Sequence, residues 1–319
     1  MFKIRYNFLI ILCLALFSGC EKEIELNLGE HEQSLAIFSL FTPNSIIANN
    51  SSFIVEVTST QSILDNSEPE FINDAEVTII ATAKDSPVDP VSERLTSSTL
   101  DDRLVYRTDQ TSPQNGFEYE LKIDHPDFPP VTATSIIPPI TRISGHEFDT
   151  FKKSKENQLP GVTRYFTNIK MEIPNNTDQD NFYHLLVWRL ENNGLSPVNI
   201  GRDVLQEQLG TDAIVVNVDN SLVFFGAHFT DETFVGTNQE INFDISFLLE
   251  EEDNPTDIII EFRSVSKEYH RYFVDGFRLT QGGENSFFVN SDNIMNNIEG
   301  GFGIFAGYTA DNVIEQFRK

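Results

Sequence analysis

The chain has 319 residues, with 49 acidic against 22 basic side chains and a formal net charge of −27 at pH 7. A chain this acidic repels phosphate backbones, so we exclude nucleic acid as a partner. It has 27 Phe but a single Trp, so most aromatic side chains are expected in a core, and a carbohydrate platform built of Trp is disfavoured.

The first 19 residues predict a secretory signal peptide. Lys3 and Arg5 precede an apolar run at 8–17, which is much shorter than the ~20 residues that span a bilayer. The run ends at Ser18-Gly19-Cys20, which resembles a bacterial lipobox. We therefore predict that Cys20 is lipidated and tethers the mature chain to a membrane. The alternative is an ordinary signal peptide followed by a chance Cys.

An acidic tether is expected at residues 20–33, directly after the lipidated Cys20. Cys13 lies inside the peptide that would be removed, and Cys20 would be capped as a thioether. The mature chain would then have no free thiol, no disulfide and no Cys-based metal site.

Residues 34–139 predict an immunoglobulin-like β-sandwich. Apolar and polar side chains alternate in short segments separated by turn residues, which is typical of half-buried strands. Asn115-Gly116 is a turn signal that predicts a hairpin between 103–108 and 117–123. The expected strands are 35–41, 52–60, 75–81, 103–108, 117–123 and 131–137.

Residues 140–319 predict a second, larger β domain, either a sandwich or a barrel. One helix is expected at about 266–281, with Ser266 as its N-cap. Its aromatic stripe of Tyr269, Tyr272, Phe273 and Phe277 is interpreted as core packing in preference to a ligand pocket. The expected fold class is all-β and mainly antiparallel. The expected strands are 164–173, 182–190, 221–229, 240–249 and 257–265.

No motif in the chain predicts catalysis, a cofactor or a metal. GFGIFA at 301–306 has the letters of a dinucleotide fingerprint but lacks its context, so its glycines are expected to let a last strand approach a neighbouring backbone closely. The carboxylates at 178–181 and 250–253 are interpreted as solvated turns, with calcium as the alternative. The six histidines are scattered singly along the sequence, at His31, His125, His146, His184, His228 and His270.

Several segments of the chain occur together in a fixed order. They are the lipobox and the acidic start at 20–25, TQSILD (60–65), INDAEV (72–77), 117–139, and above all SKEYHRYFVDGFRLTQ (266–281) and NNIEGGFGIFAGY (296–308). In these segments and their order the chain resembles a Bacteroidota lipoprotein family, domain of unknown function 4249. The resemblance covers nearly the whole mature chain, and none of these segments is a catalytic motif.

The resemblance implies a lipid-anchored outer-membrane protein that faces the cell surface. It also implies a partnership with a TonB-dependent transporter, as a non-enzymatic accessory subunit that assists nutrient capture or gating. The alternative is a stand-alone surface binding protein or adhesin, assisted by calcium, in which SLVFFGAHF (221–229) lines a pocket. A cell-envelope hydrolase is a third and weaker reading.

Overall fold

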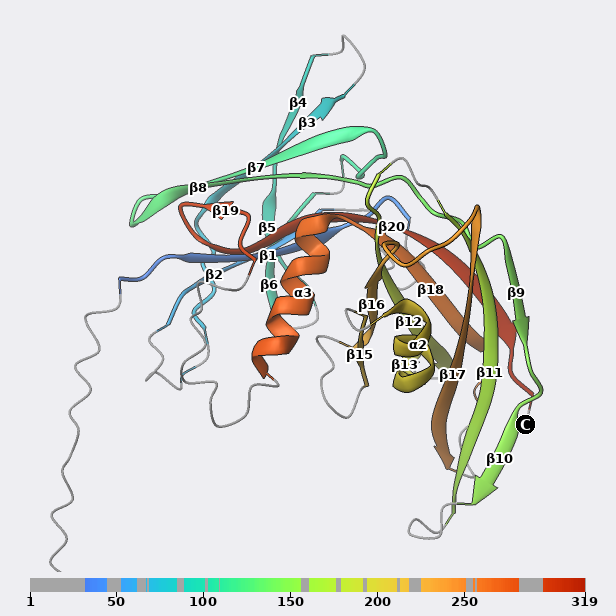
Figure 1. Ribbon diagram of the computed structural model, residues 1–319. Coiled ribbons are helices and arrows are strands. Elements are labelled where there is room, and N and C mark those ends of the chain that lie inside the picture. The colour runs from blue at the N-terminus through green and yellow to red at the C-terminus, as the bar shows by residue number, and fades with distance from the viewer. Residues whose placement is uncertain are drawn as a thin grey trace, which may run out of the picture. The chain divides into compact units, whose positions relative to one another are not determined.

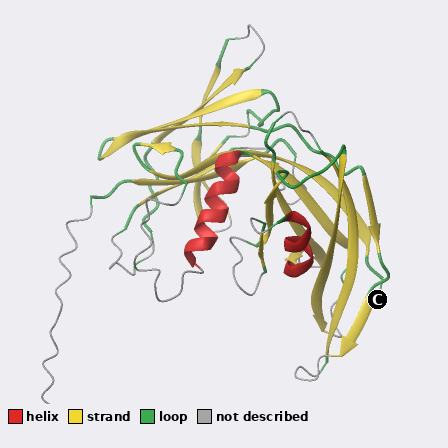
Figure 2. Cartoon of the chain, in the orientation of Figure 1, coloured by secondary structure: helices red, strands yellow, loops and turns green. Residues whose placement is uncertain are grey.

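The structure is a computed structural model. It describes residues 32–44, 53–61, 67, 69–84, 89–100, 103–108, 110–155, 161–175, 179–191, 194–210, 213–217, 225–250, 255, 257–280 and 295–318. Residues Gln33–Lys319 make up one compact unit. Strands dominate it, and the predicted all-β, mainly antiparallel fold class is confirmed (Figures 1 and 2).

The largest element is a ten-stranded sheet (Figure 1). Its strands are, in spatial order, β15 (Ile214–Val216), β16 (Gly226–Thr230), β12 (Phe182–Glu191), β18 (Asp257–Val265), β20 (Phe302–Gln316), β1 (Leu35–Phe41), β2 (Ile54–Ser59), β6 (Arg103–Arg107) and β5 (Thr96–Leu100), with β13 (Gly194–Pro197) paired to β12. Among the described strands only β1 and β20 run parallel to each other.

Two five-stranded sheets and two described helices complete the unit. One sheet has the order β19 (Ile298–Glu299), β8 (Phe128–Ile136), β7 (Phe117–His125), β3 (Glu76–Ala83) and β4 (Val91–Arg94). The other has the order β10 (Lys152–Lys155), β11 (Val162–Pro174), β17 (Asn238–Glu250) and β14 (Asn199–Ile200), with β9 (Gly145–Phe148) also paired to β11. The helices are α2 (Arg202–Leu209) and α3 (Lys267–Thr280).

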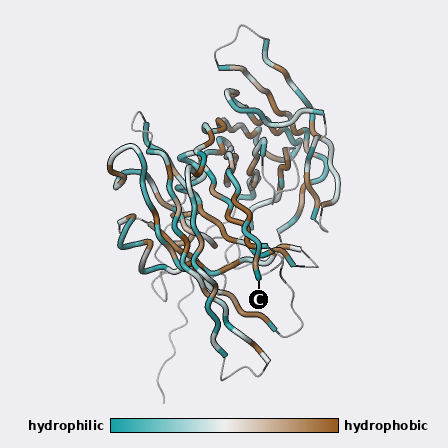
Figure 3. The backbone as a smooth tube through the Cα atoms, turned by 90° about the vertical axis from the view of Figure 1, so that its right-hand side faces the viewer, coloured by the Kyte–Doolittle hydropathy of each residue, from teal (hydrophilic) through white to brown (hydrophobic). Residues whose placement is uncertain are grey.

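Two hydrophobic cores lie between these sheets. The alternation of hydrophobic and hydrophilic residues along the strands, visible in Figure 3, turns one face of each strand inward. The first core joins β1 and β2 to β3, β7 and β8, with Tyr119 and Leu121 fully buried. The second joins β12, β16 and β18 to β11 and β17, with Phe243 and Phe262 fully buried. Both halves are therefore sandwiches of open sheets. For the second half a sandwich or a barrel was expected, and its described residues form a sandwich.

Strand β20 belongs to both cores. Phe305 packs in the first core and Val313 in the second, while Ile304 and Ala306 on its opposite face pack against α3. Because side chains alternate along a strand, both smaller sheets lie on one face of the ten-stranded sheet and α3 lies on the other. The two regions 34–139 and 140–319 thus share one sheet.

The strands expected in the described parts of the chain are present, but two other predictions were incomplete or wrong. The segments 103–108 and 117–123 do not form a hairpin, because β6 pairs with β2 and β5 while β7 pairs with β3 and β8. The turn at Gly116 instead ends a crossing between two sheets. The short helix α2 was not expected, because Gly201 at its N-cap gives it no side-chain cap.

Candidate functional site

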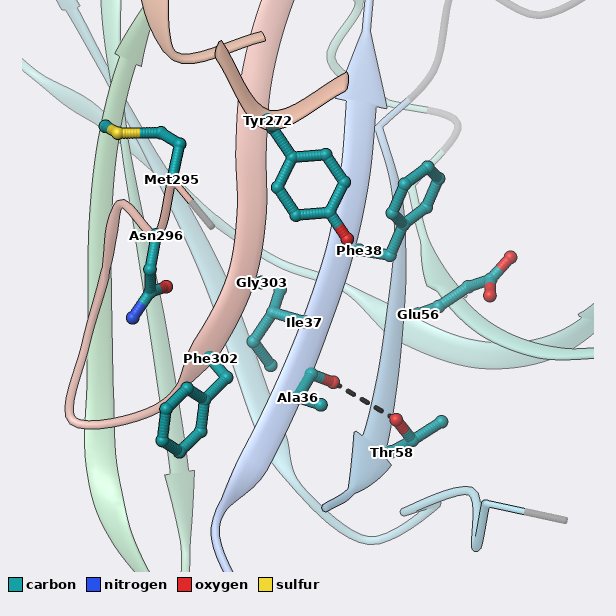
Figure 4. A pocket seen from close by; sticks show the side chains of 10 residues that line it. All are labelled: Ala36, Ile37, Phe38, Glu56, Thr58, Tyr272, Met295, Asn296, Phe302 and Gly303. Atoms are coloured by element: carbon teal, nitrogen blue, oxygen red, sulfur yellow. Dashed lines mark hydrogen bonds between the residues drawn. The ribbon is translucent and has the colours of Figure 1, made fainter. Parts of the chain in front are cut away.

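A groove of about 520 Å³ opens on the outer face of the ten-stranded sheet, beside α3 (Figure 4). Its floor is formed by Ala36 and Ile37 of β1 and Gly303 of β20. Its walls and rim come from β1, β2, α3, the segment before β19 and the start of β20, with the side chains of Phe38, Glu56, Thr58, Tyr272, Met295, Asn296 and Phe302. Segments from both ends of the chain therefore build one cavity.

The strand pattern explains the shape of the groove. In β1, Leu35 and Ile37 are buried toward the first core, so Ala36 and Phe38 face the groove. Ala36 is paired with Phe302 in the parallel register, and its small side chain leaves space beside the ring. A small residue between large aromatic ones thus leaves an open floor between walls.

Gly303 allows β20 to lie against β1. Its φ is +117°, and a Cβ atom at this position would lie 1.9 Å from the carbonyl oxygen of Ile37. Only glycine fits such an approach without displacing the neighbouring backbone. The expectation that the glycines of 301–306 serve close backbone packing is confirmed, since Gly301 would likewise place a Cβ 2.7 Å from the carbonyl oxygen of Leu35.

Most polar groups around the groove are already engaged. Thr58 donates its hydroxyl to the carbonyl of Ala36 over 3.4 Å. The amide of Asn296 donates to the carbonyl of Gly301 over 3.0 Å, and its oxygen accepts from the backbone N–H of Ile298. Arg103 donates to the carboxylate of Glu56 over 2.6 Å.

The hydroxyl of Tyr272 differs from these groups, because no hydrogen bond to it is formed by the described residues. Burial raises the pKa of Tyr272 above its ordinary value, so the hydroxyl stays protonated and remains a donor. Figure 4 shows this ring over the groove, next to Phe38. The described residues of the groove therefore offer apolar surface and the Tyr272 hydroxyl as an available donor.

Helix α3, which carries Tyr272, is held on the sheet by a buried polar network. The backbone N–H of Tyr269 donates to the Ser266 hydroxyl over 3.2 Å, which confirms Ser266 as the N-cap. The Tyr269 hydroxyl lies 2.9 Å from Nδ1 of His184, and it accepts from Arg263 over 2.9 Å. Arg263 also donates to Glu261, whose side chain is fully buried, over 2.5 Å.

The electrostatics of this network favour neutral histidines and a charged arginine. Burial, together with the neighbouring His228 and Arg263, lowers the pKa of His184 well below its ordinary value. Burial and Arg278 lower the pKa of His270 to about 4. Burial also works against the charge on Arg263, but the Glu261 carboxylate holds the pKa of Arg263 well above its ordinary value. The network is a fixed support for α3.

Three histidines that are separate in the sequence come together where α3 packs on β12 and β16. Two are on these strands, and His270 is on α3 itself. His184 and His228 are cross-strand partners in β12 and β16, and the ring of His270 lies 6.2 Å from that of His228. Sequence reasoning missed this group because the three positions lie on elements far apart in the chain. Within the described ranges, no group of three or more His, Cys, Asp or Glu side chains is arranged to hold a metal ion.

The remaining candidate residues lie apart from the groove. Cys20 and His31 fall outside the described residues, as do Asp178 and residues 251–253. His125 pairs with Asp74 at 2.9 Å, and His146 packs its ring against Phe148. Asn181 donates from its backbone and its amide to Asp231. The described end of 221–229 is buried, with Phe229 in the second core.

The aromatic residues of α3 were interpreted as core packing in preference to a ligand pocket, and the structure shows both environments. Tyr269, Phe273 and Phe277 are buried, so core packing is confirmed for these three. Tyr272 is half-buried and lines the groove. The alternation in β1 turns the small side chain of Ala36 toward the groove that Tyr272 lines.

Comparison with known protein families identifies the family of the chain. None of the helices in the described part of the chain is long and apolar enough to cross a membrane. No curated protein matches the chain. The profile of one family, described as "Domain of unknown function (DUF4249)", matches residues 21–313. Because this match spans almost the whole chain, the protein belongs to the DUF4249 family.

Proposed function

We propose that the protein is a non-enzymatic, lipid-anchored outer-membrane lipoprotein that faces the cell surface. In this proposal it is an accessory subunit of a TonB-dependent transporter and assists nutrient capture or gating. Support for the anchor comes from Ser18-Gly19-Cys20, which follows a short apolar run. Two or more acyl chains on Cys20 would hold the protein stably at the membrane.

The groove beside α3 is the observation that carries a binding role. It is an apolar cavity of about 520 Å³, within the roughly 300–1,000 Å³ that is usual for small-molecule sites. Its rings are exposed to different extents, with Phe302 55% exposed. An exposed ring beside an open apolar floor favours binding of a ligand over catalysis, which requires a reactive group at the site.

The test of the transporter partnership is co-purification from native outer membranes. The C-terminally tagged protein is extracted in mild detergent, and the proteins that accompany it are identified and quantified by mass spectrometry. A TonB-dependent transporter in stoichiometric amount is the expected result. A Cys20→Ala variant is the control for the anchor, and it should lose both labelling by an alkyne fatty acid and membrane retention. Purification of the tagged protein alone would contradict the partnership.

A stand-alone binding protein or adhesin is the second candidate. It draws on the same apolar groove, which would then bind a ligand without a transporter. Calcium and a broad panel of ligands would then raise the melting temperature of the purified protein. A melting temperature that none of these additions changes would argue against this candidate.

A further inference from the structure

We propose that the groove binds neutral, flat ring compounds that carry a hydrogen-bond acceptor. This inference rests on the proposed function only in taking the groove as a ligand site, and it does not depend on a transporter partner. Three features of the groove carry it: the arrangement of its rings, the state of its polar groups and the charge around it.

The rings form two walls across a floor without long side chains. Phe38 and Tyr272 make one wall, with ring centroids 6.4 Å apart and planes tilted by 54°. Phe302 stands across the floor from them, and it makes no ring contact within the described residues (Figure 4). A flat ring between these walls would bury exposed aromatic surface on both of its faces, in the offset or edge-on arrangements that aromatic pairs prefer.

The state of the polar groups in the groove disfavours binding of sugars and other polyols. Such ligands need several hydrogen-bonding partners, whereas Thr58 and Asn296 already use their donors on the neighbouring backbone. A polyol would exchange its bonds with water for apolar contacts, which is unfavourable. Among the described residues that line the groove, the Tyr272 hydroxyl is the donor that remains, so a ligand with one acceptor on its ring fits better than one with many hydroxyls.

The charges at the rim of the groove disfavour binding of charged ligands. Glu56 is paired with Arg103 over 2.6 Å, so its negative charge is already compensated by a cation of the chain. An anion would enter an apolar cavity of a protein with a net charge of −27. A cation would lose hydration without gaining an uncompensated counter-ion, and an anion would gain, among the described residues of the groove, only the Tyr272 hydroxyl. A neutral compound avoids this cost.

The test is isothermal titration calorimetry of the full lipoprotein in detergent with 2-naphthol, a neutral two-ring compound with one hydroxyl. Heats are corrected with the same detergent without protein. We expect saturable binding with one site per chain. Naphthalene-2-sulfonate has the same rings with a negative charge, and it should bind at least tenfold more weakly. Glucose should give no heat of binding.

Variants assign the binding to the groove. Phe302→Ala should weaken 2-naphthol binding at least tenfold, and Tyr272→Phe should weaken it severalfold by removing the donor. Phe166→Ala is the matched control, because Phe166 is 38% exposed on β11, away from the groove. Ala36→Leu fills the floor without removing a ring and should also abolish binding.

Either of two results would overturn the inference. One is a wild-type titration that does not differ from the detergent blank. The other is an equal affinity in the Phe302→Ala and Phe166→Ala variants when both keep the wild-type melting temperature. The co-purification experiment uses no ligand, so its failure removes the transporter partnership and leaves the ligand class to be decided by calorimetry.

Discussion

His184 and His228 face each other across the pairing of β12 with β16, and their imidazole rings stack with centroids 3.8 Å apart. Both side chains are buried beneath α3. A proton on one ring would place a positive charge against the other and near Arg263, in a buried site. This explains why the pKa of His184 lies well below its ordinary value, with burial as the largest cause. The buried site beneath α3 therefore favours the neutral form of both imidazoles.

We expect acid to destabilise the protein through these histidines. The pKa of His270 falls from 6.5 to about 4 on folding, so between these values the unfolded chain binds more protons than the folded one. His270 therefore does not lower the free energy of unfolding above pH 6.5, and it lowers this free energy as the pH falls toward 4. The decrease amounts to roughly 3 kcal/mol for His270. Urea unfolding at several pH values measures it.

The variant His270→Phe isolates this contribution from the titration of the many carboxylates. Its free energy of unfolding should fall less between pH 6.5 and 4 than that of the wild type. His146→Asn is the control, because His146 is exposed on β9, and this variant should follow the wild-type profile. Equal pH profiles for His270→Phe and the wild type would contradict the assignment.

The buried ion pair of Glu261 and Arg263 gives a second prediction. Their side chains are 0% and 12% exposed, so removing one partner leaves a buried charge without its counter-ion. We expect Glu261→Leu to lower the free energy of unfolding by about 3–5 kcal/mol. The double variant Glu261→Leu/Arg263→Met should recover much of this loss, because the remaining charge is removed as well.

Glu240→Gln is the matched control for the ion pair. Glu240 and Lys170 form a pair on the solvent-exposed face of β17 and β11, with side chains 47% and 39% exposed. Solvent screens such a pair, so its loss should not change the unfolding midpoint measurably. A single variant Glu261→Leu that unfolds like Glu240→Gln would show that the buried pair does not support α3.

The sequence allows the strands to be predicted well because their signal is local. Alternation in segments such as 35–41 and 117–123 reports which face is buried, and β1 and β7 follow it closely. The helix α3 was predicted from its Ser266 cap and aromatic spacing, which are also local features. The groove-lining role of Tyr272 was not predicted, because it depends on strands from both ends of the chain.

Long-range pairing is what the sequence alone does not reveal. The parallel pairing of β1 with β20 joins Ala36 to Phe302, and no local pattern identifies one as the partner of the other. The same holds for the histidines, which meet because β12 pairs with β16 and because α3, which carries His270, packs on both strands. The hairpin prediction at Asn115-Gly116 was wrong for a related reason, since a turn signal reports a bend and not the sheet that each flanking strand joins.

Gly303 provides a third prediction, on the junction of β1 and β20. In Gly303→Ala the new Cβ would collide with the carbonyl oxygen of Ile37 at 1.9 Å, and the residue would also be strained at φ +117°. We expect loss of the folded state or a melting temperature far below that of the wild type, measured by circular dichroism. Gly116→Ala is the control, with φ +81° but nothing within 4 Å of the Cβ.

The two glycine variants separate steric conflict from backbone strain. Gly116→Ala should lower the free energy of unfolding by only about 1–3 kcal/mol, the cost of a non-glycine residue in this region. If Gly303→Ala is no more destabilised than Gly116→Ala, then β20 does not lie against β1 as closely as the floor of the groove requires.

Ser266 connects the stability of α3 to the groove. Its hydroxyl accepts from the backbone N–H of Tyr269, one of the N–H groups that the helix leaves unpaired at its start. Ser266→Ala should cost about 1 kcal/mol of stability. Because Tyr272 lies in the first turns of α3 and forms a wall of the groove, the same variant should weaken 2-naphthol binding severalfold. Ser266→Thr keeps the hydroxyl and should retain both properties, so an equal loss in Ala and Thr variants would mean that the cap does not position this wall.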